Sequence, residues 1–265
     1  MKMNKKLYFL HIPKTGGVSV NKQLQDSFLE TKIKKYPPSQ PPHKDNMDEY
    51  SYIAGHLGRY PIEKIKDVDV ACLFREPVSR SISTFLYIYD RFLFASPEYS
   101  KINNFIDKAR YYLFKDEKFF NHRNLQTLFI SSTPKIITSI DKDGDNTLRK
   151  EFNTMWGFED SILDLDIAKK HIDSFKIIGT LEKHSEFMQE INAWFLKNYE
   201  VDLGVNKKNQ VFNNTLVDHN GEKYTPKIIM EMLTKQELEK ILELNSIDFE
   251  IYNYVLSKKN NPTHN

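Results

Sequence analysis

The sequence predicts an α/β fold with a central parallel sheet and helices on both sides. Short apolar runs near residues 7–10, 51–55, 69–74 and 175–179 have the length of strands. The runs at 7–10 and 69–74 each lead through a short turn into helical spacing. Strands that alternate with helices favour parallel pairing, because a parallel connection needs a crossover. We see no internal repeat or domain boundary, so we expect one domain over residues 1–265.

The composition fits one folded domain with a substantial core. The chain has 265 residues, of which 40% are hydrophobic, and this excludes a disordered protein. Lys and Arg total 38 against 36 for Asp and Glu, which gives a net charge of +2. So balanced a charge does not indicate a nucleic-acid-binding surface. We therefore expect no nucleic-acid partner, and any preference for anions has to be local.

The single cysteine and the apolar runs limit the other classes. Cys72 excludes an internal disulfide and a zinc site of several cysteines. The histidines show no spacing that indicates a metal site, so no metal is expected. No run of about 18 apolar residues is present, and the basic start is followed by too few apolar residues for a signal peptide. We expect a cytoplasmic protein without a membrane span.

The strand at 7–10 leads into a turn that is suited to hold an anion. Two adjacent glycines let backbone N–H groups point toward one place, and the following helix adds its own N–H groups and dipole. Lys14 adds a full charge, so phosphate or sulfate is the expected guest; the alternative is a tight turn without a ligand. The turn and the start of the helix are Pro13, Lys14, Thr15, Gly16, Gly17, Val18 and Ser19, and the apolar spacing continues through Val20, Leu24 and Phe28.

The strand at 51–55 ends in Gly55-His56. A histidine just past the carboxyl end of a strand lies where α/β sheets bind their ligands, so His56 is a candidate catalytic residue. The alternative is a histidine that is hydrogen-bonded within a turn. His11, which follows the first strand, is expected to have a supporting role.

The strand at 69–74 leads into a second charged junction. Arg75 follows the strand, Pro77 suits the first turn of a helix, and Ser83 lies on the second turn. Arginine makes forked contacts with phosphate and serine adds a hydroxyl, so these side chains could hold a second phosphate. Arg80 has two interpretations, a contact with the ligand or a pairing with Glu76 or a neighbouring helix.

The second half of the chain predicts further helices and loops. Helices are expected over 161–175, after residue 182 and over 247–256, and a capping box at Thr234 and Glu237 starts another. Three segments are expected to lie outside the regular elements: a proline-rich surface loop at 37–48, a loop-rich insertion at 131–153 and a frayed tail at 257–265.

These motifs resemble those of sulfotransferases that use 3′-phosphoadenosine-5′-phosphosulfate, in particular the carbohydrate and heparan-sulfate type. The order Pro-Lys-Thr-Gly-Gly at 13–17 is similar to their 5′-phosphosulfate loop. Arg75, Pro77, Arg80 and Ser83 match their R-[DE]-P-x-x-R-x-x-S pattern, which binds the 3′-phosphate. The Gly55-His56 dipeptide stands where the family carries its catalytic base. The resemblance implies a P-loop-type three-layer α/β/α fold.

The resemblance also implies a reaction and residue roles. A sulfuryl group would pass to a hydroxyl or amine of a saccharide or small-molecule metabolite, with adenosine 3′,5′-bisphosphate as the product and no metal. His56 would be the general base, and Lys14 would stabilise charge on the leaving phosphate. The donor would be bound by Pro13, Lys14, Thr15, Gly16, Gly17, Val18, Ser19, Arg75 and Ser83.

Weaker similarities extend over most of the chain. Residues 121–128 resemble the family's N-x-Q-T-R segment with Leu128 in place of the arginine, residues 178–182 resemble V-G-x-x-E, and residues 245–252 resemble N-x-x-D-x-x-x-Y. Several roles stay open. Asn124, Gln126 and Thr127 are either cofactor or acceptor contacts or, the favoured interpretation, solvent-facing residues of a helix, and Lys207 and Lys208 lie in a loop over the nucleotide or in an exposed turn.

Two other functions are consistent with the sequence. The first is a P-loop-type small-molecule kinase, which would need magnesium and a carboxylate to hold it. Glu76 is the candidate carboxylate beside a predicted strand end. The lysine precedes the glycines, whereas the phosphate loop of nucleoside-triphosphate hydrolases has the glycines first. The second alternative is a non-catalytic nucleotide-binding module, favoured if His56 faces away from the nucleotide.

Overall fold

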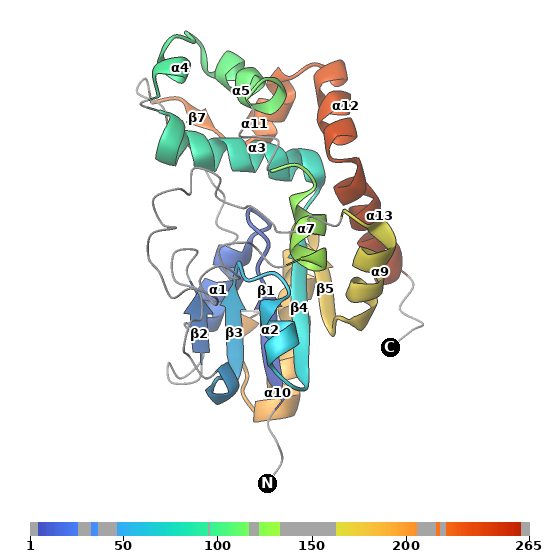
Figure 1. The fold of residues 1–265 in the computed structure, drawn as a ribbon. Helices are drawn as coiled ribbons and strands as arrows, with labels where there is room; N and C mark the ends of the chain where they lie inside the picture. The colour runs from blue at the N-terminus through green and yellow to red at the C-terminus, as the bar shows by residue number, and fades with distance from the viewer. Residues whose placement is uncertain are drawn as a thin grey trace, which may run out of the picture.

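A five-stranded, all-parallel sheet forms the centre of the protein in the computed structural model, in the order β2-β3-β1-β4-β5 (Figure 1). The strands are β1 (Lys6–Leu10), β2 (Ile33–Tyr36), β3 (Tyr52–Gly55), β4 (Val68–Phe74) and β5 (Ile177–Thr180). The structure describes residues 5–25, 33–36, 47–94, 96–116, 122–132, 163–205, 216–217 and 221–260.

The four predicted strands are confirmed, but the sequence did not predict β2. This strand has the sequence Ile-Lys-Lys-Tyr and lies at the edge of the sheet, where β3 is its one partner among the described strands. Edge strands tolerate charged residues, and a run with two lysines carries no apolar signal. The edge position of β2 therefore explains why the apolar pattern did not reveal it.

Helices flank the sheet and cover its carboxyl-terminal edge. Their bounds are α1 (Gly17–Gln25), α2 (Tyr60–Lys64), α3 (Pro77–Ile88), α4 (Pro97–Ser100), α5 (Phe105–Phe114), α7 (Leu125–Ser131), α9 (Leu165–Ser174), α10 (His184–Tyr199), α11 (Pro226–Met232), α12 (Lys235–Leu244) and α13 (Ser246–Asn260). A π-helical turn (Tyr89–Leu93) continues α3, and short 3₁₀ turns lie at Met47–Glu49 and Leu181–Lys183. A small antiparallel pair, β6 (Leu216–Val217) and β7 (Lys223–Tyr224), lies apart from the main sheet.

Local sequence signals account for several helix starts. Pro77 occupies the first turn of α3, as predicted, and the carboxylate of Glu76 accepts the N–H groups of Val78 and Ser79. The capping box predicted at Thr234 and Glu237 begins α12. Helix α13 ends at Asn260, so it includes the first four residues of the segment expected to fray.

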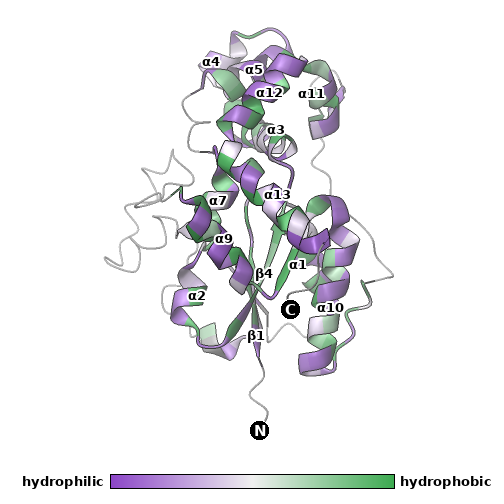
Figure 2. Cartoon of the chain, turned by 90° about the vertical axis from the view of Figure 1, so that its right-hand side faces the viewer, coloured by the Kyte–Doolittle hydropathy of each residue, from purple (hydrophilic) through white to green (hydrophobic). Residues whose placement is uncertain are grey.

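The two faces of the sheet carry different helices. Because side chains alternate along a strand, Tyr8 and Leu10 point to one face and Leu7 and Phe9 to the other. The first face packs against α2, α7, α9 and α13, and the second packs against α1 and α10. Figure 2 shows green strands enclosed by helices whose outer faces are largely purple. These two apolar layers are the main core.

A third apolar cluster joins α3 to α5, α11 and α12 above the sheet (Figure 1). Ile82 and Phe85 of α3 are fully buried there, and they pack with Tyr112 of α5 and Ile241 of α12. Helix α3 therefore belongs both to this cluster and, through its first turn, to the end of β4.

Arg80 is a buried structural residue, which settles the two interpretations of its role. Its side chain is 0% exposed, and its Nε lies 3.6 Å from the fully buried carboxylate of Asp248 in α13. Its Nη2 donates to the carbonyl of His122 at 2.7 Å and to Oδ1 of Asn245 at 3.3 Å. The ligand contact considered for Arg80 is therefore wrong, and the neighbouring-helix ion pair is correct.

The interpretation of Asn124, Gln126 and Thr127 as solvent-facing residues is also wrong. All three are buried, with Gln126 and Thr127 at 0% exposure. Asn124 has a positive φ of 47° and begins α7, and its Oδ1 accepts the N–H of Asp248 at 3.0 Å. A polar network between helices buries these side chains, and apolar spacing cannot reveal such a network.

Some predictions lie outside the described residues. These are most of the proline-rich loop and of the 131–153 insertion, the end of the tail, and Lys207 and Lys208. Among the helices that the structure does describe, none has both the length and the apolar character needed to cross a bilayer.

We expect Arg80→Met to lower the free energy of unfolding by about 3–5 kcal/mol, because it leaves the Asp248 carboxylate buried without its cation. Urea unfolding monitored by circular dichroism measures the change. Lys240→Met is the control, since its ion pair with Glu243 is exposed and should contribute little. Equally small effects from both substitutions would contradict the structural role of Arg80.

Candidate functional site

The register of the sheet brings the ends of three strands together. Leu10 at the end of β1 pairs with Gly55 of β3 on one side and with Cys72 of β4 on the other. The residues that follow these strands therefore emerge at one edge. The chain builds β2 and β3 on one side of β1 and then β4 and β5 on the other, and ligands of open α/β sheets bind at such a switch point.

The turn after β1 has the backbone that the glycines predicted. Gly16 has a φ of 95°, and its carbonyl accepts the N–H of Ser19 at 2.9 Å in the first turn of α1. A Cβ on Gly17 would lie 2.1 Å from the ring of His11, so only glycine fits there. Lys14 has a φ of 68°, which is unusual for a residue with a side chain. The turn is thus a constrained structure that precedes a helix N-terminus.

Lys14 lies over an aromatic ring that the sequence did not single out. Its Nζ is 4.5 Å from the ring centre of Tyr87 in α3, a distance typical of a cation–π contact. Burial, and next the charge of Arg75, lower the pKa of Lys14 to about 8. Burial and the neighbouring positive charge therefore both disfavour the charged form of this ammonium group.

Arg75 reaches the turn after β1 directly. Its Nη1 donates to the carbonyl of Lys14 at 3.1 Å, although the two residues are 61 positions apart in the chain. Its Nε and Nη2 donate to the hydroxyl of Ser79 at 3.0 and 2.8 Å. Burial lowers the pKa of Arg75 to about 10. The two basic residues predicted for the two ends of an anionic ligand thus lie in one site.

His56 lies beside the same turn. Its Nδ1 is 2.5 Å from the carbonyl of His11, and the two imidazole rings have their centres 4.2 Å apart. A carbonyl can only accept, so Nδ1 carries the hydrogen and Nε2 keeps the lone pair. Burial, with a smaller contribution from the charge of Lys14, lowers the pKa of His56 to about 4 and outweighs the hydrogen bond to His11, which raises it. The ring is neutral near pH 7, with Nε2 able to accept a proton.

The other predicted residues surround this centre in different ways. Pro13, Thr15 and Ser19 are buried, and Thr15 donates its hydroxyl to the carbonyl of Ile12 at 2.9 Å. Val18 is 66% exposed, because it lies on the outer side of the first turn of α1 rather than on the apolar face. Ser83 is buried on the second turn of α3, and the serine in contact with Arg75 is instead Ser79.

Gln126 binds the main chain of Arg75, and only a weak sequence signal pointed to it. Its side-chain amide donates to the carbonyl of Arg75 at 3.0 Å and accepts the N–H of Arg75 at 2.9 Å. A resemblance of residues 121–128 to a family motif drew attention to this segment but not to its contact. Pairing across 51 positions cannot be inferred from one sequence.

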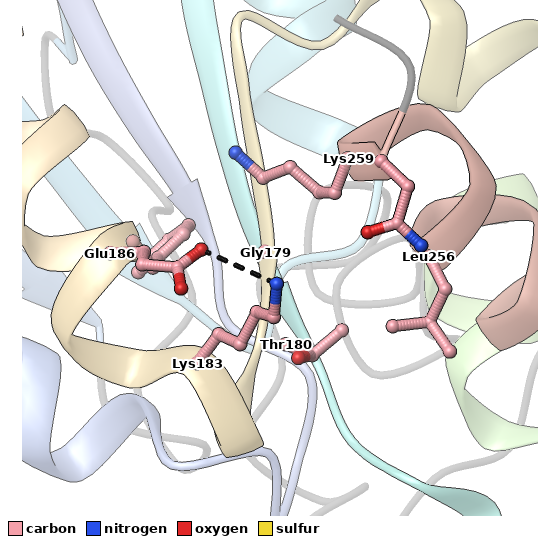
Figure 3. A pocket seen from close by; sticks show the side chains of 8 residues that line it. Gly179, Thr180, Lys183, Glu186, Leu256 and Lys259 are labelled. Atoms are coloured by element: carbon pink, nitrogen blue, oxygen red, sulfur yellow. Dashed lines mark ion pairs between the residues drawn. The ribbon is translucent and has the colours of Figure 1, made fainter.

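A small cavity lies beside the end of β5. Figure 3 shows Lys183 and Glu186 facing each other in it, with Nζ and Oε2 3.8 Å apart, and Lys259 of α13 nearby. Lys259 forms an ion pair with Glu190. The cavity is about 10 Å³, room for about one water molecule. Among the described residues, no group of three His, Cys, Asp or Glu side chains could hold a metal ion.

Comparisons with known proteins add no assignment. A scan against protein-family models finds no matching family, and a search of curated proteins finds no relative. The case for a function therefore depends on the residues and their geometry.

We expect the imidazole of His56 to titrate with a pKa near 4 and to stay neutral between about pH 5 and 8. Burial disfavours the charged form, so the shift is downward. A pH series of ¹H–¹³C NMR spectra measures it, and the spectrum of a His56→Asn variant assigns the resonance. A titration midpoint near 6.5, the value of an exposed histidine, would contradict the buried environment described for this ring.

Proposed function

We propose that this protein is a sulfotransferase that moves a sulfuryl group from 3′-phosphoadenosine-5′-phosphosulfate to a hydroxyl or amine. The observation that carries the proposal is the hydrogen bond from the Arg75 guanidinium to the carbonyl of Lys14 at 3.1 Å. It joins the two junctions whose sequences resemble the 5′- and 3′-phosphate motifs of one enzyme family. Two cations in one site suit a ligand with two separate anionic ends, and the sheet would then be of the P-loop type.

The residues divide between the two ends of the donor. The N–H groups of Thr15, Gly16, Gly17 and Val18, with the hydroxyl of Ser19, would hold the 5′ end at the start of α1. The Thr15 hydroxyl would join them only by leaving the carbonyl of Ile12. Arg75 and Ser83 would hold the 3′-phosphate. Pro13 fixes the backbone ahead of Lys14.

The chemistry requires positioning and charge stabilisation more than covalent catalysis. The acceptor oxygen would attack sulfur in line with the bridging oxygen of the 5′-phosphate, and the bond from sulfur to that oxygen would break. His56 would take the hydroxyl proton at Nε2, and its Nδ1 bond to His11 holds the tautomer that this step needs. Lys14 would stabilise the charge that develops on the phosphate that leaves.

The alternative functions receive less support. A kinase would need Glu76 as a magnesium ligand, but both oxygens of this carboxylate accept N–H groups of α3, from Val78 at 2.9 Å and Ser79 at 2.7 Å. A non-catalytic module would be favoured if His56 faced away from the nucleotide. The ring of His56 instead contacts His11 beside the proposed phosphate loop, which favours a catalytic role.

The acceptor is proposed only by class. A saccharide hydroxyl is what the resemblance implies, and a small-molecule metabolite is the other choice. The net charge of +2 does not predict the broad basic surface that a long sulfated polysaccharide would need. An oligosaccharide or small metabolite is therefore the acceptor class that we propose.

Binding and turnover test this function. We expect calorimetry to detect binding of adenosine 3′,5′-bisphosphate. ATP with magnesium should bind more weakly, because ATP lacks the 3′-phosphate that Arg75 would contact. With the phosphosulfate donor and an acceptor library, mass spectrometry should detect the mass of an added sulfate.

The variant His56→Ala should lower turnover by about 10²–10⁴-fold and leave affinity for the bisphosphate nearly unchanged, because His56 acts on the acceptor proton. Near-normal turnover would remove His56 from its role as base. Failure of the wild-type protein to bind the bisphosphate would reject the function itself.

A further inference from the structure

We propose that Gln126 is a positioning residue that fixes the direction of Arg75, and that Asp248 holds Gln126 in place. The proposal rests on the proposed function, because Arg75 is the residue assigned there to the 3′-phosphate. It adds a chain of buried contacts from the C-terminal helix α13, through α7, to the ligand-binding arginine. Neither Gln126 nor Asp248 is part of the phosphate motifs.

The first step in this chain is the pair of bonds between Gln126 and the main chain of Arg75. The amide donates to the Arg75 carbonyl at 3.0 Å and accepts its N–H at 2.9 Å. Arg75 stands between β4 and α3, where it belongs to neither element. A side-chain amide has one donor end and one acceptor end, so it satisfies both groups at once. The backbone from which the guanidinium extends is thereby fixed.

The second step holds Gln126 itself. Asp248 is 0% exposed, and its carboxylate accepts the backbone N–H of Gln126 at 3.1 Å and that of Thr127 at 2.8 Å. It also accepts the hydroxyl of Thr127 at 2.8 Å and faces Nε of Arg80 at 3.6 Å. A carboxylate that accepts the first N–H groups of a helix fixes its start. Helix α7 therefore has one position relative to α13.

The consequence concerns binding rather than stability alone. With its main chain held by Gln126, the Arg75 guanidinium is directed to the Ser79 hydroxyl and the Lys14 carbonyl before any ligand arrives. A side chain held in its binding direction loses less rotamer freedom when it meets a phosphate. Loss of Gln126 should therefore weaken recognition of the 3′-phosphate in particular.

Two neighbouring substitutions separate positioning from stability. Gln126→Met removes both bonds to Arg75 at a similar side-chain length. Thr127→Val is the matched control, because it removes a hydrogen bond to the same Asp248 from the same buried helix. The described hydrogen bonds of Thr127 go to Asp248 and not to Arg75. Calorimetry at fixed ionic strength gives dissociation constants for adenosine 3′,5′-bisphosphate and adenosine 5′-monophosphate. The constant of the monophosphate divided by that of the bisphosphate measures recognition of the 3′-phosphate, and a high ratio means strong recognition.

We expect Gln126→Met to reduce this ratio by roughly tenfold or more, and Thr127→Val to leave it within about twofold of the wild-type value. In an Arg75→Ala background, Gln126→Met should cause no further reduction, because the residue through which it acts is gone. If Gln126→Met does not fold, Gln126→Glu gives the same comparison, since it keeps an acceptor for the Arg75 N–H but places an acceptor against the Arg75 carbonyl.

The outcomes distinguish this inference from the proposed function. A wild-type ratio near one overturns both, because Arg75 then recognises no 3′-phosphate. A high wild-type ratio that Gln126→Met leaves unchanged, or that Thr127→Val reduces equally, overturns only the positioning role. An equal effect of Gln126→Met with and without Arg75 also overturns it.

Discussion

The hydrogen bond between the Arg75 guanidinium and the Lys14 carbonyl is the interaction on which the rest of the site depends. It forms because β1 and β4 are parallel neighbours, with Leu10 opposite Cys72, so the turns that follow them meet at the same edge. The pairing of β1 with β3 adds His56 from the other side. One central strand thus places two cations and a neutral imidazole around the start of α1.

The surroundings of Lys14 and Arg75 differ electrostatically from those of Arg80, the cation buried in the core. Arg80 has the Asp248 carboxylate at 3.6 Å, so its burial is compensated within the protein. Lys14 instead lies over a Tyr87 ring and beside Arg75, and burial and that neighbouring charge both lower its pKa. A cation held in this way is stabilised by an incoming anion. Strongly shifted pKa values are common at functional sites for this reason, which supports the proposed nucleotide.

Local patterns predicted the strands, the glycine turn and the start of α3, because each is encoded within a few consecutive residues. The edge strand β2 gave no such pattern, since Lys34 and Lys35 interrupt it. The roles of Gln126 and Asp248 depend on contacts between residues 51 and 122 positions apart, and no spacing rule anticipates them. Sequence reasoning therefore singled out residues that follow the strand ends, and it missed the contacts of the buried residues behind them.

A structure of the protein bound to adenosine 3′,5′-bisphosphate is the most direct measurement of the central claim. The site described here predicts one nucleotide that spans the two junctions, with its 5′-phosphate on the N–H groups that follow Lys14 and its 3′-phosphate on the Arg75 guanidinium. A nucleotide bound elsewhere, or one phosphate held by both side chains while the other faces solvent, would contradict it.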